Sequence, residues 1–475
     1  MKKLSIIAAL LISANLLNAK VELPSVISDN MVLQQNTDVA LWGKAKPGSK
    51  VTVKPEWTNE KFTTNADKVT GKWLLRVKTP SAGGPYEINF NDGEEIKVSN
   101  VLIGEVWYCS GQSNMEMPMK GYRSQPATGA AEFIAKAKKS RPIRLCNIEC
   151  NSSTQVLEYS NGMWEEHTPQ AVANTSATAY FFAEELQSVI DVPVGIVVSS
   201  WGGSSIETWI RRDYLEKDFP ELEYGHLDGE KEVRTVQQDP CLLFNGQVAP
   251  LVPYTFKGMI WYQGETNRGR ENQYIRLQET YVRMMRELFC IPDAPFYFVQ
   301  IAPYPYDKAE DWTSGYFYEA QQKSLDVIPN SGMAVTCDAG EYGTIHPAAK
   351  KEVGHRLAFL ALARNYGINA INADSPVYRS AEFTEGKAIV EFDTRDDEGL
   401  APMGRNIQGF EISGDDRIFH KADAYVNDGN KVIVSSKDVP EPVAVRYCFR
   451  NWCYGNLYNN YGIPAAPFRT DSWDL

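Results

Sequence analysis

Hydrophobic and polar positions divide most of the chain into three stretches. From Lys20 to Ser99, short alternating segments such as VALWGKA, VTVKPEW and KWLLRVKT lie between turns that contain Gly and Pro. A period of two is typical of strands with one buried face, so residues 20–99 predict an N-terminal β domain of the sandwich type. The pattern returns in KAIVEFDT, GFEISG, KVIVSS and PVAVRYCF, and predicts a second β segment or domain over residues 374–475.

Residues 100–373 change to mostly apolar strands that alternate with amphipathic helices. The predicted strands are VLIGEVWYCSG, VPVGIVVSS, KGMIWYQG, APFYFVQIAP and SGMAVTCD. The predicted helices are NTSATAYFFAEELQSVI, ENQYIRLQETYVRMMRELF, YFYEAQQKSLDVI and PAAKKEVGHRLAFLALARNYG, with Pro347 in the first turn of the last one. This alternation predicts an α/β fold, in which helices cover both faces of a parallel sheet.

The first nineteen residues follow a different pattern. Lys2 and Lys3 precede a short apolar run that ends at Asn18-Ala19. This arrangement is typical of a secretory signal peptide, so residues 1–19 predict export to the periplasm or the medium, with cleavage after Ala19. The run is too short for a permanent anchor, and no other stretch approaches the length of a membrane span, so we expect no membrane insertion.

Charge and cysteine content narrow the classes of partner. The formal net charge of −12 and the lack of a basic cluster argue against nucleic-acid binding, which needs a basic surface. Among the eight cysteines, the pairs closest in sequence are Cys146/Cys150 and Cys448/Cys453, and export would allow some of them to oxidise. Neither pair has the spacing and nearby histidines of a zinc site, so we expect no metal. The sequence indicates neither the disulfide pairing nor the oligomeric state.

Polar clusters follow four of the predicted strands. They are GQSN, SSWGGSS, QGETN and DAGEYGTIHP. The carboxyl ends of parallel strands meet at one edge of a sheet, where open α/β folds bind their ligands. We therefore expect these four clusters to form one site.

Two of these clusters contain a serine and a pair of glycines. Taken alone, Ser113 is better explained as a helix cap, because serine is common at helix N-termini. The segment is also not the Gly-x-Ser-x-Gly elbow of the α/β-hydrolases, because Met115 stands where the second glycine would be. Gly202 and Gly203 precede a helix predicted to begin near Ile206. Their amides would face a developing negative charge, unless the glycines only allow close packing.

The other two clusters contain amide side chains and a histidine. Gln263 or Asn267 would donate a side-chain N–H group to an oxyanion. Glu265 would orient a catalytic group or a substrate hydroxyl, and the alternative is that it forms a surface salt bridge. His346 is the one histidine in a strand-end loop, and imidazole suits proton transfer from a serine near neutral pH. Serine, glycine, amide and histidine in this order predict an acyl-transfer site.

The motifs that carry these residues resemble one family. GEVWYCSGQSNMEMPM, VPVGIVVSSWGGSSIETW, LFNGQVAPLVPYTFKGMIWYQGETN and IHPAAKKEVGHRLA are similar to the sialate O-acetylesterases, a branch of the SGNH hydrolases. The ending AVRYCFRNWCYGNLYNNYGIPAAPFRTDSW is also similar, so the resemblance covers nearly all of the chain after residue 19. It implies a three-layer α/β/α catalytic domain over residues 100–373 and a serine esterase that removes O-acetyl groups from sialic acids.

The resemblance also implies roles for the residues. Ser113 would attack the acetyl carbonyl to form an acyl-enzyme, and His346 would carry the proton. The amides of Ser113, Gly202 and Gly203 would form the oxyanion hole, and either Gln263 or Asn267 would complete it. This route to ester hydrolysis requires no metal or organic cofactor.

The chain departs from the SGNH pattern at the last motif. The superfamily typically has an aspartate three residues before the histidine, but Gly343 occupies that position here. The partner of His346 is then Asp338, Glu341 or a backbone carbonyl, and in the last case the site is a Ser-His dyad.

The substrate expected from the resemblance is an O-acetylated sialic acid or sialoglycan. Because sialic acid carries a carboxylate, we expect an arginine to bind it, and Arg123, Arg268 and Arg270 lie near the motif loops. An acetyl esterase acting on plant-type polysaccharides such as xylan is an alternative. A carbohydrate-binding protein without catalysis is a weaker one because Ser113 and His346 are both present.

Overall fold

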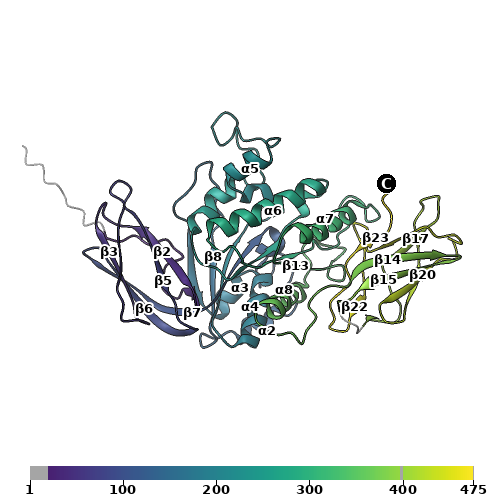
Figure 1. Cartoon of the computed structure of the whole chain (residues 1–475), viewed down its shortest axis with the longest axis horizontal. Coiled ribbons are helices and arrows are strands. Elements are labelled where there is room, and N and C mark those ends of the chain that lie inside the picture. The colour runs from purple at the N-terminus through teal and green to yellow at the C-terminus, as the bar shows by residue number, and fades with distance from the viewer. Residues whose placement is uncertain (1–19, 396–398, 474–475) are drawn as a thin grey trace, which may run out of the picture.

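The computed structural model describes residues 20–395 and 399–473. Figure 1 shows three units in a row along the longest axis: an N-terminal β unit, a central α/β unit and a C-terminal β unit. The signal peptide expected over residues 1–19 lies outside the described residues. The large sheet of the central unit is mixed, and antiparallel sheets flank it, so the chain has an α/β fold of the general kind predicted.

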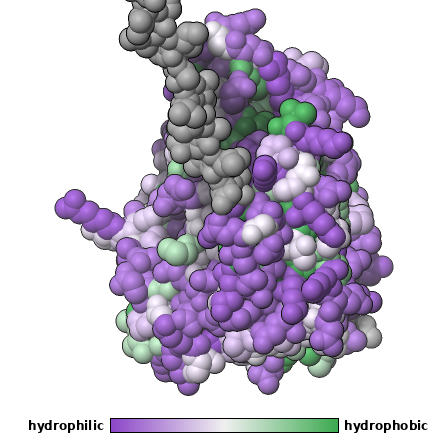
Figure 2. All heavy atoms as spheres, turned by 90° about the vertical axis from the view of Figure 1, so that its left-hand side faces the viewer, coloured by the Kyte–Doolittle hydropathy of each residue, from purple (hydrophilic) through white to green (hydrophobic). Residues whose placement is uncertain are grey.

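The N-terminal β unit consists of the antiparallel strands that alternation predicts. β2 (Asp38–Lys44) pairs with β5 (Lys72–Lys78), and β3 (Lys50–Pro55) pairs with β4 (Phe62–Asn65) and β6 (Gly83–Asn91). Alternate residues of β3 are buried, as expected for strands with one face on a core. Seen from this end of the molecule, most of the surface is hydrophilic (Figure 2).

One long strand, β7 (Glu95–Gly111), connects the N-terminal and central units. Its first part pairs with β6, its middle with β1 (Val32–Gln34), and its last part with two strands of the central sheet. The domain boundary expected between residues 99 and 100 falls inside this strand. The catalytic sheet and the N-terminal β unit therefore share a backbone segment rather than a linker.

The central sheet has the strand order β13-β12-β11-β7-β10-β8-β9. Its strands are β8 (Ile143–Ile148), β9 (Gly162–Glu166), β10 (Val194–Ser200), β11 (Gly258–Tyr262), β12 (Phe296–Val299) and β13 (Ser331–Ala334). All neighbours in this order pair in parallel except β8 and β9. The carboxyl ends of β7, β10, β11, β12 and β13 therefore meet at one edge.

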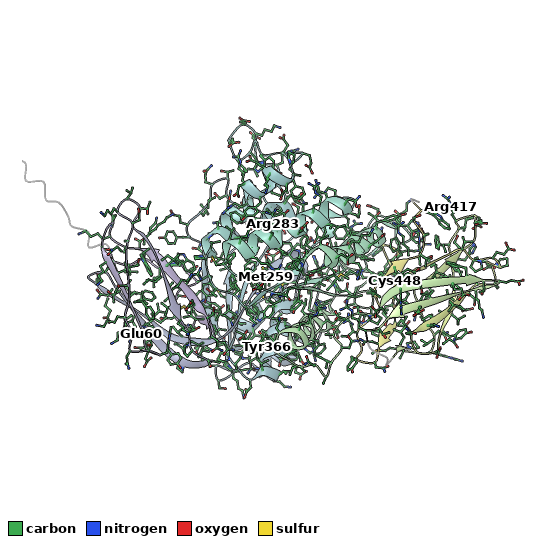
Figure 3. All side chains as sticks on the ribbon, in the orientation of Figure 1. Glu60, Met259, Arg283, Tyr366, Arg417 and Cys448 are labelled. Carbon is green, nitrogen blue, oxygen red and sulfur yellow. The ribbon has the colours of Figure 1, made fainter. Side chains whose placement is uncertain are left out.

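Helices cover both faces of this sheet. α4 (Ala177–Ile190) and α8 (Lys350–Asn365) share a hydrophobic core with Trp107 and Ile260. α6 (Glu271–Leu288) and α7 (Thr313–Val327) share a second core with Tyr108 and Met259. Met259 lies in the middle of the molecule (Figure 3). Adjacent strand residues thus point to opposite helix layers, which explains the nearly continuous apolar runs of these strands.

Two helix starts illustrate the local chemistry. α4 begins after Ser176, whose Oγ accepts a hydrogen bond from the amide of Ala179 at 3.1 Å, as an N-cap should. α8 begins at Lys350, so the prediction that Pro347 occupies its first turn is wrong. Residues 345–349 form an irregular segment instead, and the Pro347 carbonyl accepts from the Lys350 side chain.

The C-terminal β unit contains two four-stranded antiparallel sheets and a short pair of strands. The first sheet has β14 (Val377–Thr384), β15 (Lys387–Asp393), β20 (Lys431–Ser435) and β19 (Asp423–Asn427). The second has β18 (His420–Lys421), β17 (Phe410–Ser413), β21 (Ala444–Tyr447) and β23 (Phe468–Arg469), while β16 (Leu400–Pro402) pairs with β22 (Leu457–Asn459). Phe392 of the first sheet contacts Phe468 of the second, and both belong to the hydrophobic core that also contains Tyr108 and Met259.

Within residues 20–395 and 399–473, no helix has the length and apolar character needed to cross a membrane.

Candidate active site

The four predicted clusters all follow strands of the central sheet. β7 lies between β10 and β11, so the residues after these three strands are neighbours at the carboxyl edge. β13 lies three positions from β7 in the sheet order, and the segment that follows it must therefore reach across the edge.

Ser113 is the first residue of the short helix α1 (Ser113–Glu116). Gln112 occupies the N-cap position, so Ser113 is not the capping residue that a lone serine suggested. Gly111 has a φ of 144° and packs so closely on β11 that a Cβ atom would lie 2.1 Å from the Tyr262 carbonyl oxygen. This sharp strand-to-helix turn leaves Ser113 partly exposed, and its amide has no acceptor within the helix.

A tight turn, Tyr122–Gln125, contacts both Ser113 and His346. The Tyr122 hydroxyl donates to the Ser113 carbonyl oxygen at 3.2 Å, and the ring of Tyr122 meets that of His346 edge-on at 5.2 Å between centroids. The Oε1 atom of Gln125 lies 2.8 Å from Nδ1 of His346. The turn therefore brings the serine and the histidine to one place, although no hydrogen bond joins their side chains in the described structure.

The Gln125 contact decides which nitrogen of His346 is basic. An amide oxygen only accepts, so Nδ1 carries the proton and Nε2 presents its lone pair. Burial and the positive charge of Lys350 lower the pKa of His346 below its ordinary value. The ring is therefore neutral near pH 7 and able to take a proton.

Asn114 and Lys350 fix the backbone on both sides of His346. Nζ of Lys350 donates to Oδ1 of Asn114 at 2.8 Å and to the Pro347 carbonyl at 2.6 Å. Nδ2 of Asn114 donates to the Ile345 carbonyl at 3.1 Å. Since Asn114 directly follows Ser113, this buried pair links the serine turn to the histidine segment.

Glu265 completes the buried group beneath the site. Its Oε1 accepts from Asn114 at 2.7 Å, while Oε2 has no hydrogen-bond partner among the described residues. Burial raises the pKa of Glu265, and it lowers the pKa of Lys350 to about 7. Glu265 is therefore a buried support for Asn114 and not the surface salt bridge considered from sequence.

The glycine loop lies against the serine. A Cβ atom on Gly202 would be 3.4 Å from Cβ of Ser113, so the absence of a side chain allows this approach. The Gly202 amide donates to Oε2 of Glu116 at 2.5 Å, and Gly203 has a φ of 71°. The helix expected near Ile206 is only a four-residue 3-10 segment, Ile206–Trp209.

Gln263 and Asn267 are buried and bind the loop that follows the glycines. Nε2 of Gln263 donates to the Ser204 carbonyl at 3.0 Å and to Oδ1 of Asn267 at 2.7 Å. Nδ2 of Asn267 donates to Oε2 of Glu207 at 2.9 Å. Both N–H groups of Gln263 and one of Asn267 are thus already used inside the protein.

The two acids considered as partners of His346 bind other groups. Asp338 forms a two-bond ion pair with Arg356, at 2.8 and 2.5 Å, and also accepts from the Tyr458 hydroxyl at 3.0 Å. Oε1 of Glu341 accepts from the Ala348 amide at 2.6 Å. In the described structure, the hydrogen-bond partner of the His346 ring is Gln125 instead.

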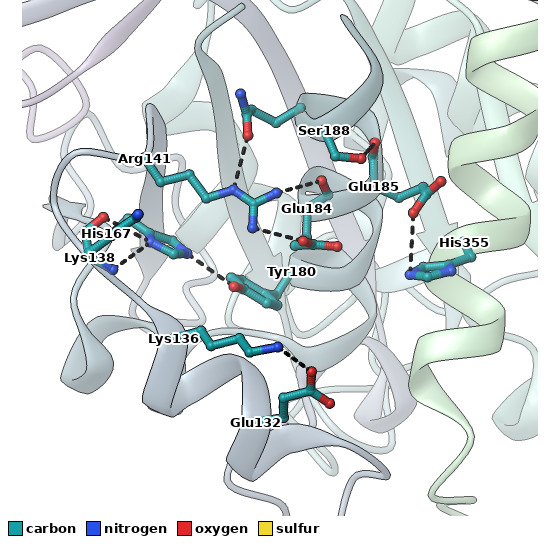
Figure 4. Close-up of polar contacts among 11 residues, drawn as sticks. Glu132, Lys136, Lys138, Arg141, His167, Tyr180, Glu184, Glu185, Ser188 and His355 are labelled. Atoms are coloured by element: carbon teal, nitrogen blue, oxygen red, sulfur yellow. Dashed lines mark hydrogen bonds and ion pairs between the residues drawn. The ribbon is translucent and has the colours of Figure 1, made fainter. Parts of the chain in front are cut away.

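Two other histidines lie in a separate polar cluster (Figure 4). His167 contacts the Lys138 backbone and, through Nε2, the Tyr180 hydroxyl at 3.0 Å. His355 lies 3.7 Å from Oε2 of Glu185 on the neighbouring helix. Glu184, Glu185 and His355 bring three potential ligand atoms within 4.8 Å, but Glu184 already pairs with Arg141 at 2.7 Å.

The three arginines near the motifs have different environments. Arg270 pairs with Glu207 at 2.8 Å, and Arg268 stacks over the Tyr306 ring with its guanidinium carbon 3.2 Å from the centroid. Arg123 is exposed in the turn that holds His346, and no ion pair involves it within the described ranges.

Sequence reasoning missed five residues that shape this site: Asn114, Glu116, Tyr122, Gln125 and Lys350. The first four lie in GQSNMEMPMKGYRSQ, a segment without strand or helix periodicity. Lys350 had one available signal, because it lies only four residues after His346.

A serine and a histidine at the carboxyl edge of a helix-covered parallel sheet form an arrangement suited to a hydrolase of carboxylic esters. The chain belongs to the family described as carbohydrate esterase, sialic acid-specific acetylesterase, which matches residues 103–363.

Relatives that cover three quarters or more of the chain are consistent with this family. The chain is 26% identical to a sialate O-acetylesterase of Mus musculus, over 94% of this chain and 93% of that protein. It is 27% identical to a sialate O-acetylesterase of Homo sapiens, over 77% and 75%. The crystal structure of a carbohydrate acetylesterase from Xanthomonas citri superposes with a TM-score of 0.85 at 35% identity, covering 96% of this chain and all of that one.

Proposed function

We propose that this protein is an SGNH-type serine esterase that removes O-acetyl groups from sialic acids. The observation that carries the proposal is the turn Tyr122–Gln125, which holds Ser113 and the correct tautomer of His346 together. The four motif loops at one sheet edge and the family membership support the same chemistry.

In the proposed mechanism, Oγ of Ser113 attacks the acetyl carbonyl and Nε2 of His346 takes its proton. The tetrahedral intermediate collapses to an acetyl-enzyme when His346 returns the proton to the departing sugar oxygen. Water, activated by the same nitrogen, then releases acetate and restores Ser113.

Backbone amides stabilise the oxyanion in this proposal. The amide of Ser113 is one donor, and the neighbouring Gly202 amide is the second. To accept a hydrogen bond from the Gly202 amide, the acyl oxygen must displace the Glu116 carboxyl group that accepts it in this structure. Burial raises the pKa of Glu116, while its hydrogen bond from the Gly202 amide acts against that rise. Gln263 and Asn267 keep the glycine loop in position, and Gly203 allows its turn.

We further propose that Arg123 binds the sialic acid carboxylate. The Arg123 side chain is exposed, and Arg123 lies two residues before Gln125. It provides a positive charge for an anionic substrate in a protein whose net charge is −12. Arginine binds carboxylates through two parallel hydrogen bonds, which would orient the sugar relative to Ser113. The pattern of residues 1–19 supports export of the protein to the periplasm or the medium.

Hydrolysis of a chromogenic acetyl ester by three variants tests the catalytic proposal. We expect Ser113→Ala and His346→Ala to lower kcat by about 1,000-fold or more. Ser188→Ala, an exposed serine of α4, should retain wild-type turnover. Wild-type turnover in Ser113→Ala would show that another residue is the nucleophile.

Replacing Arg123 tests the substrate. Arg123→Gln should raise KM for 9-O-acetylated sialic acid about tenfold, because a charge-assisted interaction is lost, and leave the neutral chromogenic ester unaffected. The wild-type enzyme should also remove acetyl groups from 9-O-acetylated sialic acid faster than from acetylated xylan. The reverse preference, with no effect of Arg123→Gln, would favour a plant-type polysaccharide as substrate.

A further inference from the structure

Three cysteines gather where the C-terminal β unit meets the central unit. Cys337 lies in the segment after β13, Cys448 directly follows β21, and Cys453 lies five residues further on. Cys337 and Cys448 are buried, whereas Cys453 is half-buried. Figure 3 labels Cys448 in the C-terminal unit. We call these residues the thiol cluster.

Gly455 shows how close two of the sulfur atoms are. A Cβ atom on Gly455 would lie 2.7 Å from Sγ of Cys448 and 3.0 Å from Sγ of Cys337. The two sulfurs are therefore less than about 6 Å apart, a separation that side-chain rotation closes to a disulfide bond.

The backbone around Cys337 is already anchored to the C-terminal unit. The Gly455 amide donates to the Cys337 carbonyl at 3.1 Å, and Sγ of Cys337 donates to the Ala465 carbonyl at 3.4 Å. These contacts fasten the backbone and the sulfur of Cys337 to the C-terminal unit that carries Cys448.

We propose that Cys337 and Cys448 form a disulfide bond in the exported protein. The bond fastens the segment that leads to His346 to the C-terminal β unit. A protein disulfide of the oxidising compartment supplies the oxidant. The Cys448 thiolate attacks that disulfide and releases one thiol, and the Cys337 thiolate then attacks the Cys448 sulfur and releases the second. Two thiols of this chain are oxidised, and one disulfide of the oxidant is reduced to two thiols.

Cys453, which is half-buried, is the competing partner for Cys448. Sγ of Cys453 donates to the backbone carbonyl of Cys448 at 3.2 Å. A Cys448–Cys453 bond would close only a short loop, whereas Cys337–Cys448 closes one of about 110 residues and restricts the unfolded chain more strongly.

Peptide mapping of the full-length wild-type protein, exported by the expression host, tests the pairing directly. Trypsin cleaves after Lys323, Lys350, Arg446, Arg450 and Arg469, so each cysteine of the cluster falls in a different peptide. Without reductant, mass spectrometry should find Ser324–Lys350 joined to Tyr447–Arg450, and a reductant should separate them. Finding Cys337 as a free thiol, or Tyr447–Arg450 joined to Asn451–Arg469, would overturn the proposal.

Thermal unfolding gives a second measurement that does not depend on esterase activity. Cys337→Ser and Cys448→Ser should each lower Tm by about 5 °C or more, and a reductant should bring wild type down to the same value. Cys290→Ser, an exposed cysteine outside the cluster, should leave Tm unchanged. A wild-type Tm that is insensitive to reductant contradicts the bond, whatever the outcome for the catalytic proposal.

Discussion

His346 is held by a neutral amide oxygen, and this determines how it can act as a base. The Gln125 contact fixes the proton on Nδ1 but offers no negative charge to stabilise the imidazolium ion. Lys350 adds a positive charge nearby, and both this charge and burial lower the pKa of the ring. The site therefore has a base that stays neutral to lower pH than an ordinary histidine.

Lys350 should set the acid limb of the pH profile. Catalysis needs neutral His346, so kcat/KM falls as pH drops through the histidine pKa, below its usual value. In that pH range Lys350 is protonated, because its own pKa is about 7. Lys350→Met removes the charge, so the His346 pKa rises and the acid limb moves to higher pH, by about half a unit to one unit.

A profile of kcat/KM against pH for Lys350→Met measures this shift. Lys351→Met is the matched control, since Lys351 is the next residue of α8 and lies over the Phe133 ring instead. A lower kcat is also expected, because the Asn114 and Pro347 oxygens lose their donor. A lower kcat with an unmoved acid limb would show that Lys350 acts only through packing.

The turn Tyr122–Gln125 is the element that completes the site. Gln125→Leu removes the acceptor for Nδ1 and frees the ring to adopt the wrong tautomer, so we expect kcat to fall about 100-fold or more. Gln125→Glu keeps an acceptor and adds a negative charge, so it should retain more activity and move the acid limb to higher pH. Hydrolysis of the chromogenic ester measures both, with Arg123→Gln as a control in the same turn. Equal losses in both Gln125 variants would contradict an orienting role.

Elements were predictable where periodicity is strong. The five predicted strands of the central unit all form, because each is an apolar run buried between two helix layers. That Ser113 and His346 belong to one site could be predicted, because the carboxyl ends of parallel strands meet at one edge of the sheet. The turn at residues 122–125 could not be predicted, since its segment has no period and its role depends on contacts between residues about 220 apart in the chain.

At the scale of the whole molecule, the C-terminal β unit is part of the catalytic assembly. The Asp338–Arg356 pair lies at the base of the segment that carries His346, and the Tyr458 hydroxyl of the C-terminal unit binds Asp338. At the other end, β7 extends from the N-terminal unit to the turn before Ser113. Each of the two proposed catalytic residues, Ser113 and His346, thus follows a backbone segment that a flanking unit holds.

Asp338→Asn distinguishes this supporting role from the role of partner to His346 that its nearness in sequence suggested. The side chains of Arg356 and Asp338 are only 8% and 10% exposed. Removing one charge leaves the other buried without compensation, so we expect unfolding free energy to fall by about 3–5 kcal/mol. At a temperature where the variant is folded, kcat should remain within a few-fold of wild type, because Gln125 still holds the His346 ring. Urea unfolding and chromogenic ester hydrolysis measure the two quantities.

Tyr458→Phe and Glu341→Gln are the controls for Asp338→Asn. Tyr458→Phe removes one neutral donor and leaves the ion pair intact, so its cost should be about 1 kcal/mol. Glu341→Gln keeps an oxygen for the Ala348 amide and should change kcat little. If Asp338→Asn instead loses kcat more than 100-fold while its stability is unchanged, Asp338 assists His346 directly during turnover. The Gln125 contact would then describe only the resting enzyme.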